Sequence, residues 1–207
     1  MTPLKKSAAL RGVTPRKAPT QSRAALTVEA ILEGAAQVLE EGGLERYTTN
    51  AIAARAGVSI GSLYQYFPTR DAVTVALIER ERVDLAREAT AALALADRRQ
   101  ALHRLIEVAV HHQSRRPALA VLLDFEQHRL SAILPASGHG ATVRTALAGF
   151  FRDSYRGAWL APELAAAELM ALISSLTDIA GRHGAVQPVR LVARIEGAVL
   201  GYLGTFE

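Results

Sequence analysis

Apolar residues recur along this chain at the three- and four-residue spacing of an α-helix, and this periodicity limits the possible folds more than any other feature. The first such stretch spans residues 22–41, and its apolar stripe consists of Val28, Ile31, Leu32, Ala35, Val38 and Leu39. Gly42-Gly43 is expected to end it, and residues 131–140 read as a loop. No segment has the strict alternation of a β-strand. The sequence therefore predicts an all-α protein of about nine helices.

Positive charge is concentrated in the first third of the chain. Residues 1–70 contain nine Lys and Arg against five Glu, whereas residues 71–207 contain fifteen basic and fifteen acidic residues. Residues 1–22 hold five Lys and Arg, no acid and three Pro, so we expect a flexible basic arm there. Such an arm suits binding to phosphates, although a soluble leader without that role would have the same composition.

Composition and motifs argue against several classes of protein. The chain contains no Cys, which excludes disulfides, thiolate metal sites and cysteine nucleophiles. The most apolar run, residues 164–176, contains Glu168 and is shorter than a membrane span, so we expect no membrane segment. There is also no secretory signal pattern, and we assign the chain to the cytoplasm by default. Because no Ser/His/Asp order, phosphate loop or GxGxxG motif occurs, we expect neither catalysis nor a cofactor.

A helix-turn-helix pattern occupies Thr48–Phe67 (TTNAIAARAGVSIGSLYQYF). It predicts one short helix over residues 49–56 and a second over residues 60–66. Gly57 occupies the turn, where a left-handed residue reverses the chain, and the Ser59 hydroxyl can cap the second helix. Small residues at the start of the second helix allow close approach to base edges, as a recognition helix in the major groove requires.

The predicted DNA-binding surface combines hydroxyls, small residues and one cation. Hydroxyl groups suit phosphate oxygens, the Gln65 amide can read adenine through two hydrogen bonds, and Ile60 can contact a thymine methyl group. Arg70 adds a charge for a phosphate just beyond the second helix. The predicted surface consists of Thr48, Thr49, Ser59, Ile60, Gly61, Ser62, Tyr64, Gln65, Tyr66 and Arg70. The alternative is two ordinary packed helices whose tyrosines fill the core.

Residues 23–77 resemble the DNA-binding head of the TetR family of transcriptional regulators. The resemblance rests on Gly42-Gly43, Tyr47-Thr48-Thr49, Ile52-Ala53, Ala56-Gly57-Val58-Ser59, Gly61-Ser62-Leu63-Tyr64 and Tyr66-Phe67-Pro68. At Arg70 the family commonly has Lys, and the positive charge survives this difference.

The resemblance implies that the protein is a homodimer that binds double-stranded DNA at a pseudo-palindromic operator. It also implies that a small effector releases the protein from this operator. It predicts a helix-turn-helix domain over residues 23–70 and a helical ligand-binding and dimerisation domain over residues 71–207. The second region matches the family only in its helical layout, so the effector does not carry over. An activator or a ligand-independent DNA binder on the same fold stays open, as does a helical binding protein or enzyme without DNA function. Salt-dependent binding to duplex DNA would exclude the last of these.

Aromatic residues in the second region predict a pocket for a mainly apolar effector. Phe125, Phe150, Phe151, Tyr155 and Trp159 lie in the middle of this region, where core packing would explain them equally well. His112 can supply a polar contact, although a histidine satisfied within the core is the more usual case. The predicted pocket consists of Leu105, Ala109, His112, Leu122, Phe125, Phe151, Tyr155, Leu172 and Ser175.

Small residues on the last predicted helix favour close helix packing, because Ala193, Gly197 and Gly201 recur at four-residue spacing. With the preceding helix, this predicts a dimer interface of two helices from each subunit, and packing within one chain is the alternative. The predicted interface consists of Leu164, Ala167, Ala171, Ser174, Asp178, Val192, Ile195, Gly197, Val199 and Gly201.

One helix face has the residues of a possible metal site. His103, Glu107 and His111 share this face at a spacing that could hold a metal ion. The opposite face carries Leu102, Leu105, Ile106 and Ala109. We therefore expect the polar face to be solvated, with no metal bound.

Overall fold

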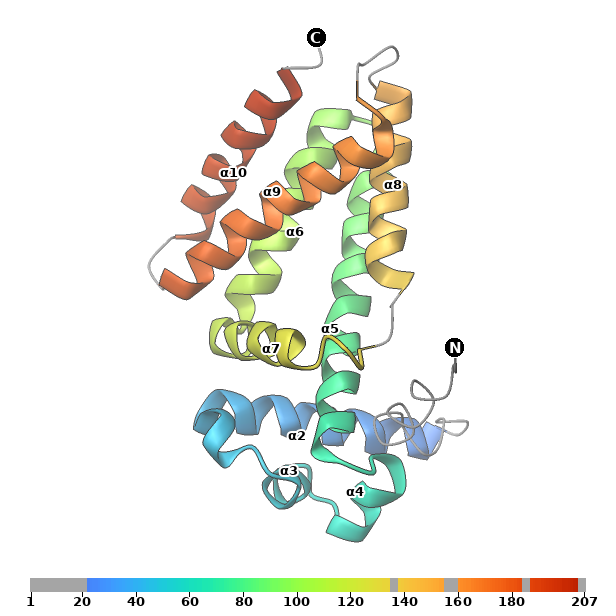
Figure 1. Cartoon of the computed structure of the whole chain (residues 1–207), viewed down its shortest axis with the longest axis vertical. Helices are drawn as coiled ribbons and strands as arrows, with labels where there is room; N and C mark the ends of the chain where they lie inside the picture. Colours follow the sequence, from blue (N-terminus) through green and yellow to red (C-terminus); the bar gives the residue numbers. More distant parts are fainter. Residues whose placement is uncertain (1–21, 135–137, 155–159, 184–186, 205–207) are drawn as a thin grey trace, which may run out of the picture. The chain divides into compact units, whose positions relative to one another are not determined.

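The computed structural model describes residues 22–134, 138–154, 160–183 and 187–204, and within these ranges every regular element is a helix (Figure 1). The all-α prediction is confirmed. The helices are α2 (Ser22–Arg46), α3 (Thr49–Arg55), α4 (Ile60–Tyr66), α5 (Arg70–Leu93), α6 (Arg98–Arg115), α7 (Pro117–Arg129), α8 (Gly138–Ser154), α9 (Pro162–His183) and α10 (Pro188–Leu203). The predicted basic arm, apart from Ser22, lies outside the described residues.

The predicted end of the first helix at Gly42-Gly43 is confirmed as a break within α2: Gly43 takes a non-helical conformation with φ 60° and ψ −165°, and a short second helical segment continues from there to Arg46. One predicted helix boundary is wrong. The predicted loop over residues 131–140 is shorter than expected, since α8 already begins at Gly138. Other boundaries follow local capping: the Asp97 carboxylate accepts a hydrogen bond of 2.8 Å from the Gln100 N–H at the start of α6.

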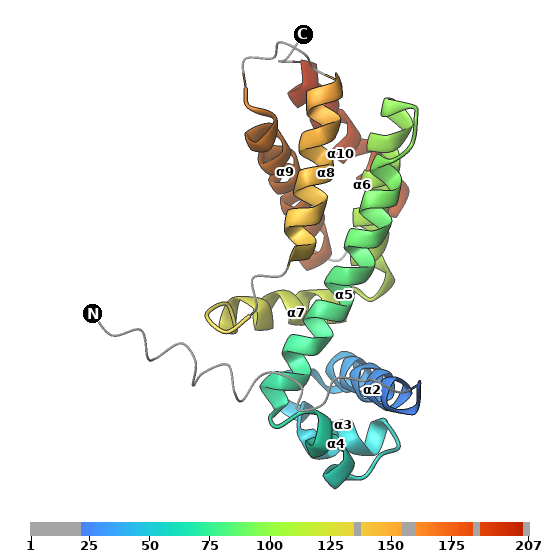
Figure 2. The same cartoon turned by 90° about the vertical axis from the view of Figure 1, so that its right-hand side faces the viewer.

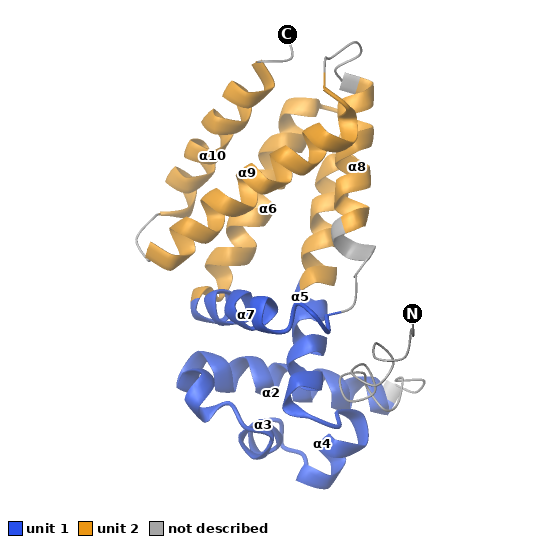
Figure 3. Ribbon diagram, in the orientation of Figure 1, with its two compact units in different colours: residues 1–81, 118–136 blue, residues 82–117, 137–207 orange. Residues whose placement is uncertain are grey.

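The chain divides into two compact units (Figure 3). Unit 1 comprises residues 1–81 and 118–136, and unit 2 comprises residues 82–117 and 137–207. Helix α5 contributes to both units. Helix α7, apart from Pro117, belongs to unit 1 together with residues 130–136, although the chain before and after residues 118–136 belongs to unit 2.

The core of unit 1 joins α2, α3, α4, the first part of α5 and α7. Tyr47 and Phe67 are among its fully buried side chains. Other core members are Ile31, Leu32, Ala35, Ala36, Leu39, Ile52, Ala53, Leu63, Ala72, Val73, Leu77, Ile78, Leu119 and Leu123. Helices α2 and α3 approach so closely that a Cβ atom on Gly34 would lie 2.9 Å from the backbone nitrogen of Ala56. Glycine at this position therefore permits the packing of α3 against α2.

The core of unit 2 joins the second part of α5 with α6, α8, α9 and α10, and Figure 2 shows α8 and α9 side by side. Its fully buried aliphatic side chains come from four helices and include Ile106, Leu147, Leu169 and Ile195. Helix α9 is the one helix in the described ranges that is long and apolar enough to cross a membrane, with a mean hydropathy of 1.4. The apolar residues of α9 lie on two sides of the helix: Leu169 and Ile173 are buried in unit 2, whereas Leu164 and Ile179 are exposed.

Candidate nucleic-acid interface

The local fold of α3 and α4 is set by two hydroxyl caps and one glycine. The Thr48 side chain accepts a hydrogen bond of 3.2 Å from the Ala51 N–H at the start of α3. The Ser59 side chain accepts one of 3.0 Å from the Ser62 N–H at the start of α4. Between the helices Gly57 has φ +67°, the left-handed conformation that the turn requires. The helix-turn-helix prediction is therefore confirmed in its two helices, in the Ser59 cap and in the Gly57 turn, and the Thr48 cap is an additional feature.

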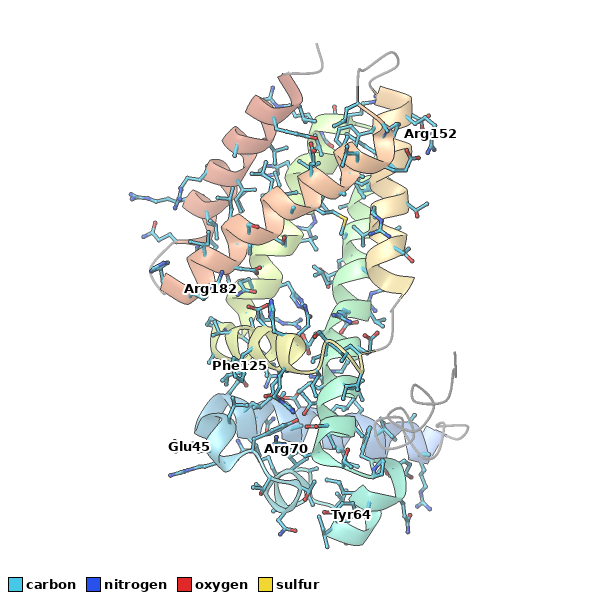
Figure 4. All side chains as sticks on the ribbon, viewed as in Figure 1. Glu45, Tyr64, Arg70, Phe125, Arg152 and Arg182 are labelled. Atoms are coloured by element: carbon cyan, nitrogen blue, oxygen red, sulfur yellow. The ribbon has the colours of Figure 1, made fainter. Side chains whose placement is uncertain are left out.

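Burial of one side of α4 fixes which side faces outward. Leu63 and Phe67 are fully buried in the core of unit 1. Ile60, Gly61, Tyr64 and Gln65 are exposed, and Figure 4 shows Tyr64 on the outer side of α4. Tyr66 is half-buried and packs against the core, so it offers less of its side chain to a partner.

Two pairs of hydroxyl groups connect the predicted DNA-binding residues. The Tyr64 hydroxyl lies 3.1 Å from the Thr49 hydroxyl, which ties the exposed ring on α4 to the start of α3. The Ser59 and Ser62 hydroxyls lie 2.8 Å apart at the start of α4. These contacts limit the rotamers of side chains that would otherwise be free at the surface. The geometry therefore presents fixed hydroxyls beside the small Gly61, as close approach to a nucleic-acid backbone requires.

Arg70 is held against Tyr47 at the start of α5. One guanidinium nitrogen donates a hydrogen bond of 3.5 Å to the Tyr47 carbonyl oxygen, and the guanidinium carbon lies 5.8 Å from the centre of the Tyr47 ring. The ring itself is held in place, because it is fully buried and its hydroxyl accepts a hydrogen bond of 3.2 Å from the Thr74 hydroxyl. The same burial raises the pKa of Tyr47 to about 12. The Arg70 side chain nevertheless stays 42% exposed and can reach a phosphate.

Sequence reasoning missed a charged network around Arg129, at the end of α7. Its guanidinium donates hydrogen bonds of 3.0 and 2.6 Å to the two carboxylate oxygens of Glu126 and one of 2.6 Å to Asp71. Glu126 is only 2% exposed. The pKa of Arg129 is raised above its usual range, mainly by its hydrogen bonds to Glu126 and to a smaller extent by those to Asp71. The spacing of Glu126 and Arg129 could have suggested their pairing, but nothing in the sequence pointed to Asp71.

A second missed cation lies on α3. Arg55 is partly exposed and pairs with Glu41, and its Nε donates a hydrogen bond of 2.6 Å to the Gln37 side chain. Both partners lie on α2, so these contacts fasten α3 to α2 at the surface of unit 1.

Residues 31–77 match the model of the family described as bacterial regulatory proteins, tetR family. This range contains the core of α2, all of α3 and α4, and the start of α5. The chain carries the DNA-binding head of the TetR family. No curated protein sequence matches the chain.

Solved structures of bacterial regulators, several of them described as TetR-family regulators, have the same fold over most of this chain. The fatty acid degradation regulator FadR from Bacillus halodurans is 17% identical, with a TM-score of 0.72 over 84% of this chain and 94% of its own. PfmR from Thermus thermophilus is 18% identical, with a TM-score of 0.65 over 82% of this chain and 96% of its own. A TetR-family regulator from Streptomyces coelicolor is 22% identical, with a TM-score of 0.64 over 87% and 99%. The TetR-like fold thus extends beyond the head.

The structure does not bring the predicted pocket residues together in one unit. Leu105 and Phe151 are buried in the core of unit 2, and the partly buried Ala109 and Leu172 pack against this core. In the same unit His112 is half-buried and Ser175 is exposed. Leu122 and Phe125 lie on α7 in unit 1, Leu122 against its core and Phe125 57% exposed (Figure 4). Tyr155 lies outside the described residues.

The predicted dimer residues divide between the surface and the core of unit 2. Ile195 and Val199 are buried in the core and Val192 packs against it, so these side chains face α6 and α9 and leave the opposite side of α10 for a partner. Asp178 is half-buried. The exposed members are Leu164, Ala167, Ala171 and Ser174 on α9 and Gly197 and Gly201 on α10. A surface candidate therefore exists, but it is smaller than the predicted set.

The face of α6 with the residues of a possible metal site makes polar contacts with carboxylates. The two ring nitrogens of His103 face different carboxylates, Glu107 at 3.5 Å and Glu196 of α10 at 3.2 Å. His111 is exposed on the same helix. In the part of the chain that the structure describes, no group of three such side chains converges as metal ligands would.

Proposed function

We propose that this protein is a dimeric transcriptional repressor that binds a pseudo-palindromic operator and leaves it when a small, mainly apolar effector binds. Its DNA-binding domain would span residues 23–70, preceded by the basic arm of residues 1–22, and its ligand-binding and dimerisation domain residues 71–207. The observation that carries the proposal is the outward side of α4, where exposed Ile60, Gly61, Tyr64 and Gln65 stand on a helix capped and oriented by Ser59. This function involves no catalysis and belongs in the cytoplasm, where chromosomal DNA is accessible.

Each exposed group on this surface has a chemical role toward duplex DNA. Gln65 would read a base edge in the major groove, and Ile60 would contact a thymine methyl group. The Tyr64 and Thr49 hydroxyls and the Arg70 guanidinium would bind phosphates, which set the register of the head on the duplex. Thr48 and Ser59 act mainly through their caps, because their side-chain oxygens already accept backbone hydrogen bonds.

Exposed apolar residues on α9 and α10 support a homodimer. Leu164 and Ile179 on α9 and Val189 and Leu200 on α10 are all well exposed, which is unfavourable for a chain that stays monomeric in water. On the same two helices the small exposed residues Ala167, Ala171, Gly197 and Gly201 would let helices of a second copy approach closely. Two helices from each subunit would then bury these faces in a four-helix interface.

The effector would bind to the helical domain. Its mainly apolar character is proposed because the interior of unit 2 is lined by Ala, Leu, Val and Ile, with Thr177 as its one buried polar residue in the described ranges. The half-buried His112 would supply a polar contact. The sign of regulation follows the TetR resemblance, in which the effector-free form binds the operator.

Replacing Gln65 with Ala tests the head. We expect Gln65→Ala to relax base preference at one position in each half-site and to weaken operator binding by about 1–3 kcal/mol. The duplex would be selected from a random library by the wild-type protein and titrated in gel shifts at several salt concentrations. Gln100→Ala, which removes an exposed amide of unit 2, is the matched control and should bind as the wild type does. Unchanged affinity and base preference in Gln65→Ala would remove this side chain from the base contacts.

A further inference from the structure

The same carboxylate oxygen of Asp71 faces two arginines in unit 1. Asp71 Oδ1 lies 2.6 Å from a guanidinium nitrogen of Arg129 on α7 and 3.8 Å from one of Arg70, the residue proposed to bind a phosphate. A second hydrogen bond of 3.3 Å joins Arg129 to Asp71 Oδ2. In the described part of the chain, these are the ion pairs that Asp71 makes. Arg129 thus holds both oxygens of the carboxylate that is nearest in sequence to Arg70.

The remaining contacts of Arg129 fix it in this position. The buried Glu126 accepts three further hydrogen bonds from the same guanidinium, so the group cannot leave Asp71 without also leaving a buried carboxylate. Arg70, by contrast, is held by weaker contacts: the carbonyl and the ring of Tyr47 and the longer pairing with Asp71. A guanidinium held in this way can turn toward a phosphate at small cost.

We propose that Arg129 is a positioning residue for DNA binding: by occupying Asp71, it keeps the Arg70 guanidinium available to a DNA phosphate. Without Arg129, Arg70 is the ion-pair partner that Asp71 keeps in the described residues, at 3.8 Å. Asp71 would then compete with the phosphate for the same cation, and an ion pair within the head would replace one with DNA. Helix α7 would thereby set the charge that the head offers to DNA. The inference rests on the proposed function, because it concerns the affinity of the head for a duplex.

The test compares two multiple variants. Arg129→Gln alone would leave Glu126 buried without a partner and risk unfolding, so E126Q/R129Q is used, which keeps the net charge unchanged. We expect it to bind the duplex selected by the wild type about tenfold more weakly, with the slope of log affinity against log salt reduced by about 0.9 per head, because one phosphate contact is lost. Adding D71N removes the competing carboxylate and should restore both the affinity and the slope.

The control separates this effect from added charge. E163Q raises the net charge by the same amount as D71N. Glu163 pairs with Arg152 in unit 2, far in sequence from the head. E126Q/R129Q/E163Q should therefore stay as weak as E126Q/R129Q. If D71N restores nothing, or E163Q restores as much, Arg129 acts only as a structural tie and the inference is overturned. If the wild type binds no duplex, the proposed function fails and the inference with it. If the wild type binds the selected duplex but the variants bind it with the same affinity and salt dependence, the inference is contradicted and the proposed function is not.

Discussion

Replacing Gly201 with Leu is expected to convert the protein to a monomer and to weaken operator binding by about 10²–10⁴-fold, the range in which linking two binding modules raises affinity. Within the chain a Cβ atom on Gly201 meets nothing within 4 Å, so the larger side chain should not disturb unit 2 itself. In the proposed interface it would stand between helices of the two subunits, where added bulk prevents close packing. Light scattering would measure the mass, and fluorescence anisotropy the affinity for the selected duplex.

Gly149→Leu is the matched control for this substitution. Gly149 lies on α8 in the same unit, and a Cβ atom there also meets nothing within 4 Å. Both substitutions replace a helical glycine, so both should raise helix propensity equally. We expect Gly149→Leu to stay dimeric with unchanged operator affinity. A Gly201→Leu variant that remains dimeric and binds DNA normally would remove this part of α10 from the interface.

Replacing Phe67 with Ala is expected to lower the free energy of unfolding by about 3–5 kcal/mol, the usual cost of truncating a fully buried phenylalanine. Phe67 follows α4 directly and is fully buried, so the cavity would lie beneath the recognition helix. Operator binding should fall as well, since α4 would lose its fixed orientation. Urea unfolding followed by circular dichroism would measure the loss of stability.

Tyr64→Ala truncates an aromatic residue on the same helix that is 41% exposed. It should change stability by only about 0.5 kcal/mol, as exposed substitutions usually do, and yet weaken operator binding by removing a phosphate contact. The two variants thus separate the core side of α4 from its outward side. If Phe67→Ala lowers the free energy of unfolding by less than about 1 kcal/mol, the assignment of Phe67 to the core is contradicted. If Tyr64→Ala binds the operator as tightly as the wild type, the proposal that Tyr64 on the outward side of α4 contacts DNA is contradicted.

Features set by a few neighbouring residues were predictable from the sequence. The caps at Thr48 and Ser59 act over three residues, and the left-handed Gly57 is required by the turn that follows it. By contrast, the bonds between Arg129 and Asp71 join residues 58 apart, and the approach of Gly34 to Ala56 depends on how two helices cross. Local pattern does not determine such distances.

Helical periodicity also identifies apolar faces without saying what covers them. Ile195 and Val199 were predicted to lie in the dimer interface because they belong to the apolar pattern of α10, but they are buried against the rest of unit 2. The predicted pocket residues divide between the two units for a related reason. Nothing in the sequence of α7 indicates that it joins unit 1, so the prediction grouped Leu122 and Phe125 with residues of the other unit.

The most direct test of the account is a competition titration of the wild-type protein at near-physiological salt. A labelled duplex selected from a random library would be displaced either by itself or by a scrambled duplex of equal length and composition. We expect the selected duplex to compete at least about 10³-fold more strongly, the lower end of the range for specific DNA-binding proteins, and both affinities to fall steeply as salt is raised. Equal competition by the two duplexes, or binding that ignores salt, would contradict the claim that this chain is a sequence-specific DNA-binding regulator.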